Sequence, residues 1–189
     1  MIKEEKYPRV TTILFEAGLT DFSKINPVVL EASAKFGTAV HLATKLWDET
    51  NLNMETLSAP LLPYLEAWKK FKRDYGITCF VDIEKHVISK KWKYQGHLDR
   101  IVIVDGERTL IDIKSGNTVM PATAIQTAGY KIGWEETSKQ RIRQRWCVQV
   151  LEDGYKITEF KERTDESVFI ACLQLYRWKE KNLRGKNNG

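Results

Sequence analysis

Two carboxylates and a lysine lie close together in the stretch GHLDRIVIVDGERTLIDIKSG, residues 96–116. Asp112 and Lys114 are two residues apart on an expected strand, so their side chains share one face. Asp99, on the preceding strand of the same hairpin, is expected to come alongside Asp112. Such a group of charges is costly in an apolar hairpin unless something neutralises it, and carboxylate oxygens suit Mg²⁺ or Mn²⁺. A lysine beside such an ion can hold or deprotonate a water, so the stretch indicates metal-dependent hydrolysis.

A plainer interpretation fits the same residues. Asp99, Asp112 and Lys114 would then be surface charges offset by weak ion pairs, as is usual for an arbitrary Asp-x-Lys in a strand. The neighbouring runs IVIV and LIDI, however, are apolar on both faces. That pattern is typical of a central strand covered on both sides, where charges are costly, and it favours the functional interpretation.

The elements that must position these residues follow from periodicity and turn signals. Helices are expected over residues 28–50, 58–75, from 118 or 121 to 136, and 164–181, and strands over 77–89, 93–105, 108–114, 143–152 and 155–162. Asn26 before Pro27 is a helix-start pair, Ser58 is expected to cap the second helix, and Asp-Gly dipeptides at 105–106 and 153–154 are hairpin turns. This order predicts an α/β (α+β) fold with a mixed central β-sheet flanked by helices, and not a doubly wound parallel sheet.

Composition sets broader limits. The 189 residues are 42% hydrophobic and 29% charged, without linker or repeat, so we expect one domain. It would comprise a helical N-terminal part (1–76), a sheet core (77–162) and a C-terminal helix (164–182). Three scattered cysteines exclude a four-cysteine zinc or iron–sulfur site, and no apolar run suits a signal peptide or a membrane span. We therefore expect a cytoplasmic protein whose net charge of +5 suits, without requiring, a nucleic-acid partner.

Five short motifs occur in an order and spacing that resemble a known family. They are Tyr7-Pro8-Arg9-Val10-Thr11-Thr12-Ile13-Leu14, Gly37-Thr38-Ala39-Val40-His41, Gly96-x-x-Asp99, Asp112-Ile113-Lys114 and Gln126-x-x-x-Tyr130. Together they resemble the PD-(D/E)XK nuclease superfamily, in the RecB-like phage exonuclease branch that includes the mitochondrial genome maintenance exonuclease. The resemblance covers residues 7–130. Two positions depart from it: Arg9 replaces a small residue, and Asp99 follows Gly-His-Leu instead of proline.

The resemblance implies a restriction-endonuclease-like core and a metal site. The groups that would hold Mg²⁺ or Mn²⁺ are Asp99, Asp112, the backbone carbonyl of Ile113, and His41. Lys114 would orient the attacking water. A lone histidine in an apolar helix is more often a core residue, so the role of His41 depends on the resemblance. Gly37, one turn earlier, would let that helix approach the sheet closely.

Further residues have roles that the resemblance suggests and the pattern leaves open. Glu84 is placed like an acid that supports the site or binds a second metal, although a solvent-facing glutamate fits nearly as well. Gln126 and Tyr130 share one helical face and would brace the catalytic site and touch DNA, where a core tyrosine with an incidental glutamine is the alternative. Ser115 would contact a phosphate or occupy a turn.

Arg141, Arg143 and Arg145 stand at strand spacing and are expected to share one face, where they would follow DNA phosphates. A charged edge strand explains them equally well. His86 and His97 have no support from the motifs and are interpreted as structural.

These features predict a metal-dependent DNA exonuclease that hydrolyses phosphodiester bonds from DNA ends in phage-type recombination or replication. Its expected partners are single- or double-stranded DNA with free ends and a single-strand annealing or replication protein. One alternative is a structure-specific or restriction-like endonuclease, and another is a catalytically idle DNA-binding protein of the same fold. The complete set of Asp99, Asp112 and Lys114 argues against an idle protein.

Overall fold

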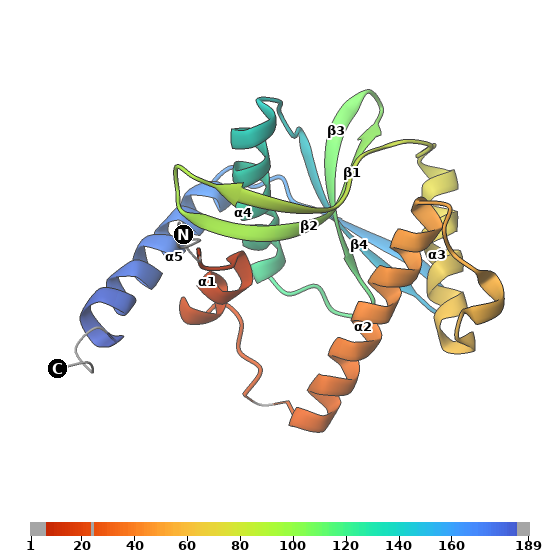
Figure 1. The fold of residues 1–189 in the computed structure, drawn as a ribbon, viewed down its shortest axis with the longest axis horizontal. Helices are drawn as coiled ribbons and strands as arrows, with labels where there is room; N and C mark the ends of the chain where they lie inside the picture. The colour runs from red at the N-terminus through yellow and green to blue at the C-terminus, as the bar shows by residue number, and fades with distance from the viewer. Residues whose placement is uncertain (1–6, 24, 185–189) are drawn as a thin grey trace, which may run out of the picture.

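The computed structural model describes residues 7–23 and 25–184 and contains a single five-stranded sheet within them (Figure 1). Its main helices are α1 (Val10–Glu16), α2 (Pro27–Asp48), α3 (Leu62–Asp74), α4 (Ala122–Ser138) and α5 (Asp165–Lys179). Its strands are β1 (Phe80–Ser89), β2 (Tyr94–Val104), β3 (Glu107–Lys114), β4 (Gln144–Leu151) and β5 (Gly154–Glu159). The strand order is β1-β2-β3-β4-β5, with β3 and β4 parallel and the other neighbours antiparallel. The predicted mixed sheet flanked by helices is confirmed.

Local signals explain where most of these elements begin. The Asn26 side chain accepts a hydrogen bond from the Val28 amide at 2.9 Å and caps α2 as predicted. Ser58 makes no such bond, and a short 3₁₀ turn precedes α3, which begins at Leu62. Both residues of the 105–106 turn have positive φ, as a tight hairpin with a right-handed twist requires.

Helix α1 falls on the first motif, where no helix was predicted. It buries Val10, Ile13 and Leu14 against the sheet side of the molecule. The N-terminal half of α2, by contrast, is largely exposed, and Val28 and Val29 lie on its surface. Among residues 7–23 and 25–184, no helix combines the length and the apolar character needed to cross a bilayer.

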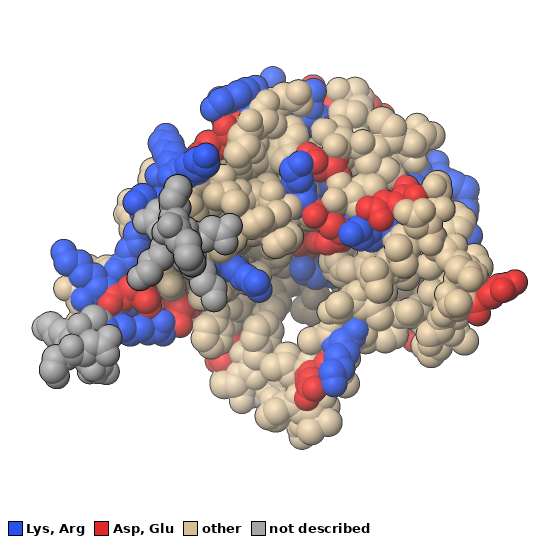
Figure 2. Space-filling view, viewed as in Figure 1, with Lys and Arg blue, Asp and Glu red and all other residues tan. Residues whose placement is uncertain are grey.

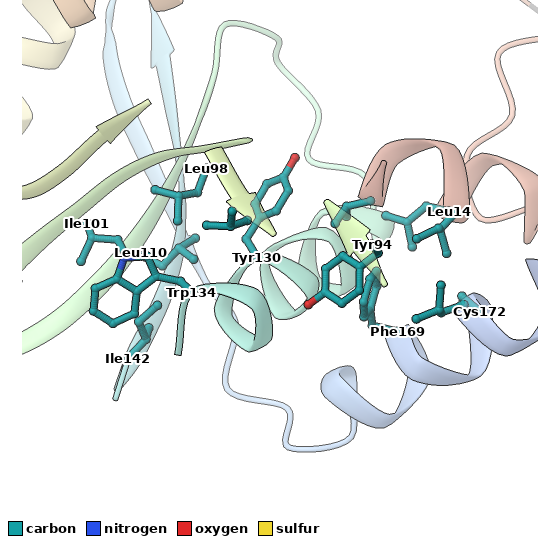
Figure 3. Close-up of a cluster of buried hydrophobic side chains, with 14 residues drawn as sticks. Leu14, Tyr94, Leu98, Ile101, Leu110, Tyr130, Trp134, Ile142, Phe169 and Cys172 are labelled. Carbon is teal, nitrogen blue, oxygen red and sulfur yellow. The ribbon is translucent and has the colours of Figure 1, made fainter. Parts of the chain in front are cut away.

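Helices cover both faces of the sheet (Figure 1). On one face α4, α1 and α5 surround an apolar cluster that includes Leu98, Leu110 and Trp134 (Figure 3). On the other face α3 inserts the fully buried Trp68 and Phe71 against the central strands. Strands β2 and β3 are therefore covered on both sides, as their apolar sequences predicted.

The β1–β2 hairpin changes face where it meets the rest of the sheet. Leu98 belongs to the apolar cluster at α4, whereas Arg100 lies on the opposite side beside Trp68. Regular alternation would put these two residues on one face. The neighbouring pairs of the ladder, Ile83 with Arg100 and Lys85 with Leu98, place Glu84 opposite Asp99. Glu84 has a φ of +47°, a left-handed conformation that costs a non-glycine residue on the order of 1 kcal/mol. The two acids thus occupy an irregular point of the hairpin, and both leave the regular ladder there.

Candidate metal and catalytic site

Three elements bring a histidine and two acids together. Helix α2 carries His41, β1 carries Glu84 and β2 carries Asp99. His41 Nδ1 lies 3.5 Å from Asp99 Oδ1 and 3.8 Å from Glu84 Oε1. One ligand atom from each of the three residues lies within 4.8 Å of the others. An imidazole nitrogen and two carboxylate oxygens form a donor set that suits Mn²⁺, and the oxygens suit Mg²⁺.

Asp112 and Lys114 lie at the end of β3, beside this cluster. The Asp112 side chain is 2% exposed, and Lys114 Nζ lies 2.8 Å from its Oδ2. This ion pair is the contact that Oδ2 makes with the described side chains. Gln126 Nε2 donates to the other oxygen, Oδ1, at 3.1 Å. A buried carboxylate with one ammonium and one amide as partners keeps lone pairs that a cation or an ordered water can satisfy, so the residues present fit a divalent cation.

The backbone of Ile113 joins the two groups. Its amide donates to Asp99 Oδ2 at 2.6 Å, while Asp99 Oδ1 is the oxygen nearer His41. The predicted ligands His41 and Asp99 therefore lie together. Glu84, which the sequence left between a supporting and a solvent-facing role, belongs to the same cluster. Asp112 is next to this group but is held by Lys114 and the α4 side chain described above.

Helix α4 presents Gln126 and Tyr130 on one face, as predicted. Gln126 Nε2 donates to the Tyr130 hydroxyl at 3.0 Å as well as to Asp112. The Tyr130 ring is buried, and its hydroxyl points away from the apolar cluster (Figure 3). A Cβ on Gly96 would lie 2.6 Å from Tyr130 Cε1, so only glycine lets β2 pass beneath this ring. This close approach explains the glycine of the Gly-x-x-Asp motif.

The expected role of Gly37 is not supported. A Cβ there would lie 3.6 Å from Ser115 Oγ, an ordinary van der Waals distance, so the approach of α2 to the sheet does not require glycine. The contact does place Ser115, directly after Lys114, beneath the helix that carries His41.

The prediction that three arginines share one exposed strand face is wrong. Arg145 is 7% exposed, and it donates to Asp165 Oδ2 at 2.6 Å and to the Ala124 carbonyl at 2.7 Å. It is a structural residue that ties β4 to α4 and α5, and it is unavailable to DNA. The edge-strand alternative is also wrong, because β4 lies between β3 and β5.

The other two arginines, Arg141 and Arg143, precede β4 and lie away from the carboxylates of the candidate site. Arg141 is exposed and pairs with Glu135 at 2.8 Å. The Arg143 amide donates to the Arg108 carbonyl at the start of β3. Because Lys114 is at the other end of β3, about 20 Å away at about 3.3 Å per residue, these arginines do not contribute to the same site.

His86 and His97 also lie outside the cluster. Their rings stack with centroids 4.5 Å apart on the exposed side of the β1–β2 hairpin. His86 Nε2 lies 2.9 Å from Gln95 Oε1, which fits the structural interpretation.

The charges around the site shift the protonation of its groups. Burial by itself would lower the pKa of His41, but the charges of Asp99 and Glu84 raise it to about 9. Burial raises the pKa of Asp99 to about 6, and the charge of Asp112 adds to this effect while His41 and Lys114 oppose it. Burial would lower the pKa of Lys114, but Asp112 and Asp99 outweigh it and raise that pKa above the ordinary value. Lys114 is therefore charged at neutral pH and is suited to orient a water and not to take a proton from it.

We expect the stability of the metal-free protein to fall as the pH rises from about 6.5 to about 9. His41 binds its proton more tightly in the folded chain, with a pKa of about 9 against 6.5 in the unfolded chain. This contribution is complete below the unfolded pKa and lost above the folded one, and it amounts to on the order of 2 kcal/mol for a partly exposed group. Urea unfolding in chelator between about pH 6 and about pH 9.5 measures it. His41→Gln should remove most of the slope, and an unchanged slope would contradict the ion pairing.

Comparisons with known proteins do not identify a family. No protein-family model and no curated protein matches the chain. A solved structure described as the crystal structure of SSO0001 is similar at 16% sequence identity and a TM-score of 0.44, over 96% of this chain and 84% of that chain. A likeness of this size carries no argument about function, which must follow from the site.

Proposed function

We propose that the chain is a metal-dependent DNA exonuclease of the PD-(D/E)XK superfamily with a restriction-endonuclease-like core. The observation that carries the proposal is the convergence, at one point of a covered sheet, of residues far apart in the sequence. They are His41, Glu84, Asp99, Asp112 and Lys114. Burial makes such a group of charges expensive, and the three carboxylates exceed the charge that Lys114 offsets at Asp112, so a bound cation would complete the group.

The residues divide the work of phosphodiester hydrolysis between them. A bound divalent cation would supply Lewis-acid polarisation of the phosphate and a more acidic water. His41, Glu84 and Asp99 would hold that cation from three different elements, and Asp112 beside them would add its charge to the attraction. Lys114, held charged against Asp112, would orient the attacking water and stabilise the negative charge that develops on the phosphate.

The α4 residues would keep the catalytic carboxylate in place. Gln126 fixes one oxygen of Asp112, and Tyr130 in turn accepts from the same amide. Because the Tyr130 ring is locked above Gly96, this chain of contacts leaves Asp112 little freedom. Such fixed orientation is what catalysis by positioned charges requires.

DNA is the substrate class that the charge and shape favour. The chain has a net charge of +5, and Figure 2 shows its surface hollowed beside α2, the helix that carries His41. A surface hollowed beside this helix suits a strand end better than the side of a closed duplex. The described strands are joined without a long insertion that could read base edges, so little sequence preference is expected.

The test is digestion of end-labelled linear duplex, linear single strand and closed circular duplex with Mg²⁺ or Mn²⁺. We expect progressive degradation of linear DNA from its ends, inhibition as salt rises, and intact closed circles, with no cleavage of any substrate in chelator. Nicking or linearisation of closed circles at a comparable rate would favour the endonuclease alternative. Binding of DNA without cleavage of any of the three would favour the idle protein.

A further inference from the structure

Arg100 lies directly beneath the candidate ligands and is completely buried, with 0% of its side chain exposed. Its guanidinium makes four hydrogen bonds: Nε to Asp48 Oδ2 (2.9 Å), Nη1 to Glu84 Oε1 (2.9 Å) and to the Asp99 carbonyl (2.8 Å), and Nη2 to Thr44 Oγ1 (3.3 Å). It therefore connects α2, β1 and β2, which are the three elements that carry the ligands.

Three of these four contacts bear on the ligand residues, one contact for each residue. Arg100 holds the carboxylate of Glu84 itself and the backbone of Asp99. Thr44, which accepts from Arg100, donates its hydroxyl hydrogen to the carbonyl of His41 one turn earlier at 3.0 Å. One side chain thus touches or adjoins every member of the cluster.

The far side of Arg100 is anchored just as firmly. Asp48, also fully buried, accepts from Lys72 Nζ at 2.7 Å and from Trp68 Nε1 at 3.0 Å as well as from Arg100. The positive charges of Arg100 and Lys72 therefore balance the negative charges of Asp48 and Glu84. Apolar residues of similar volume often stabilise a fold as well as a buried ion network does, so stability alone does not explain this arrangement.

The backbone of Glu84 gives a reason for the network. Its φ of +47° is unfavourable for a glutamate and persists only where surrounding contacts impose it. Arg100 donates the shorter of the two contacts that hold the side chain of this strained residue, at 2.9 Å against 3.8 Å for His41 Nδ1. Without Arg100, the pairing with His41 alone would hold the Glu84 carboxylate.

We propose that Arg100 is a positioning residue that presets His41, Glu84 and Asp99 for a divalent cation. This inference rests on the proposed function only in taking a cation to bind at these three residues. It assigns Arg100 no contact with the substrate or with the cation.

The test is a direct Mn²⁺ titration of the purified full chain by calorimetry, which requires no DNA cleavage. Arg100→Lys keeps the charge but loses the fork of donors, and it should weaken Mn²⁺ binding by about tenfold or more, as loss of a residue that orients metal ligands does. Because Arg100 holds the Glu84 carboxylate directly and the other two ligands only through backbone or Thr44, the same change in a Glu84→Ala background should weaken Mn²⁺ binding by clearly less than it does in wild type. Equal effects in both backgrounds would overturn the proposal.

Arg145→Lys is the matched control, because Arg145 is a second buried arginine paired with an aspartate, and among the described residues its hydrogen bonds are to α4, α5 and the segment before α5 and not to the three ligand residues. It should lower the melting temperature in chelator and leave Mn²⁺ affinity within about twofold. An equal loss of affinity in Arg145→Lys would assign the effect to general destabilisation and overturn the proposal. If Arg100→Lys does not fold, Thr44→Val, which keeps the volume and removes one acceptor, should weaken binding by about threefold, and unchanged affinity would overturn the proposal.

Failure of the inference is distinguishable from failure of the proposed function. Wild-type protein that binds Mn²⁺ while Arg100→Lys binds it equally well overturns the role of Arg100 alone. Wild-type protein that binds no Mn²⁺ overturns the cation site and both proposals with it.

Discussion

Asp112→Asn should abolish DNA cleavage, with a loss of about a thousandfold or more, while the protein stays folded. Asparagine has the shape of aspartate and can still accept the hydrogen bond from Gln126 at Oδ1. It lacks the charge that attracts a cation, and its amide nitrogen can replace the oxygen that faces Lys114. Cleavage of end-labelled linear DNA by wild type and variant measures the loss.

The stability of this variant should differ little from that of wild type. Removing the charge of Asp112 loses the attraction to Lys114 but also relieves the repulsion that helps to raise the pKa of Asp99. The two effects oppose each other, so the free energy of unfolding in chelator should change by about 1 kcal/mol or less. Asp165→Asn is the control: it breaks the buried pair with Arg145, so it should lose stability and retain cleavage. Retained cleavage in Asp112→Asn would contradict the assignment of the catalytic carboxylate.

Lys114→Ala should reduce cleavage by about a hundredfold to a thousandfold, because no other described cation contacts Asp112. Its effect on stability should differ from that of Asp112→Asn. The variant leaves a buried carboxylate without its cation, so it should unfold more easily by about 1 to 3 kcal/mol near neutral pH. The stability deficit should shrink as the pH falls and the carboxylates take up protons.

Cleavage assays and urea unfolding of the same preparation separate the two effects. Lys131→Ala is the control, since Lys131 forms a partly exposed ion pair with Glu166 between α4 and α5. It should change neither activity nor stability by much. Normal cleavage by Lys114→Ala would show that the Asp-x-Lys motif is not catalytic in this protein.

Most of the fold follows from local patterns. The alternation of apolar residues predicted the strands, and the apolar faces of IVIV and LIDI predicted that they are central. The cap at Asn26 and the 105–106 turn were predictable because each depends on a few adjacent residues. Helix α1 was not predicted because no capping side chain marks its start and because seven residues are too few to show a helical repeat of apolar positions.

The candidate site was predictable only in part. A period of two puts Asp112 and Lys114 on one face, and a period of 3.6 puts Gln126 and Tyr130 on one face, so these pairs follow from sequence. The same reasoning failed for Arg145, which Asp165 draws into the core from another element. Strand spacing predicts which residues share a face of the sheet, but it does not predict which element packs against that face.

The sequence by itself determined the elements other than α1, the mixed sheet and the residues with catalytic potential, because hydrophobic periodicity and turn preferences act within a few residues. Only the tertiary structure decided that Glu84 joins His41 and Asp99, because that requires an irregular point in the β1–β2 hairpin and a left-handed backbone at a glutamate. It also decided the role of Arg100, whose partners are up to 56 residues away in the chain. Such contacts depend on how α2 docks on the sheet, and the free energy of that docking is shared among many distant residues.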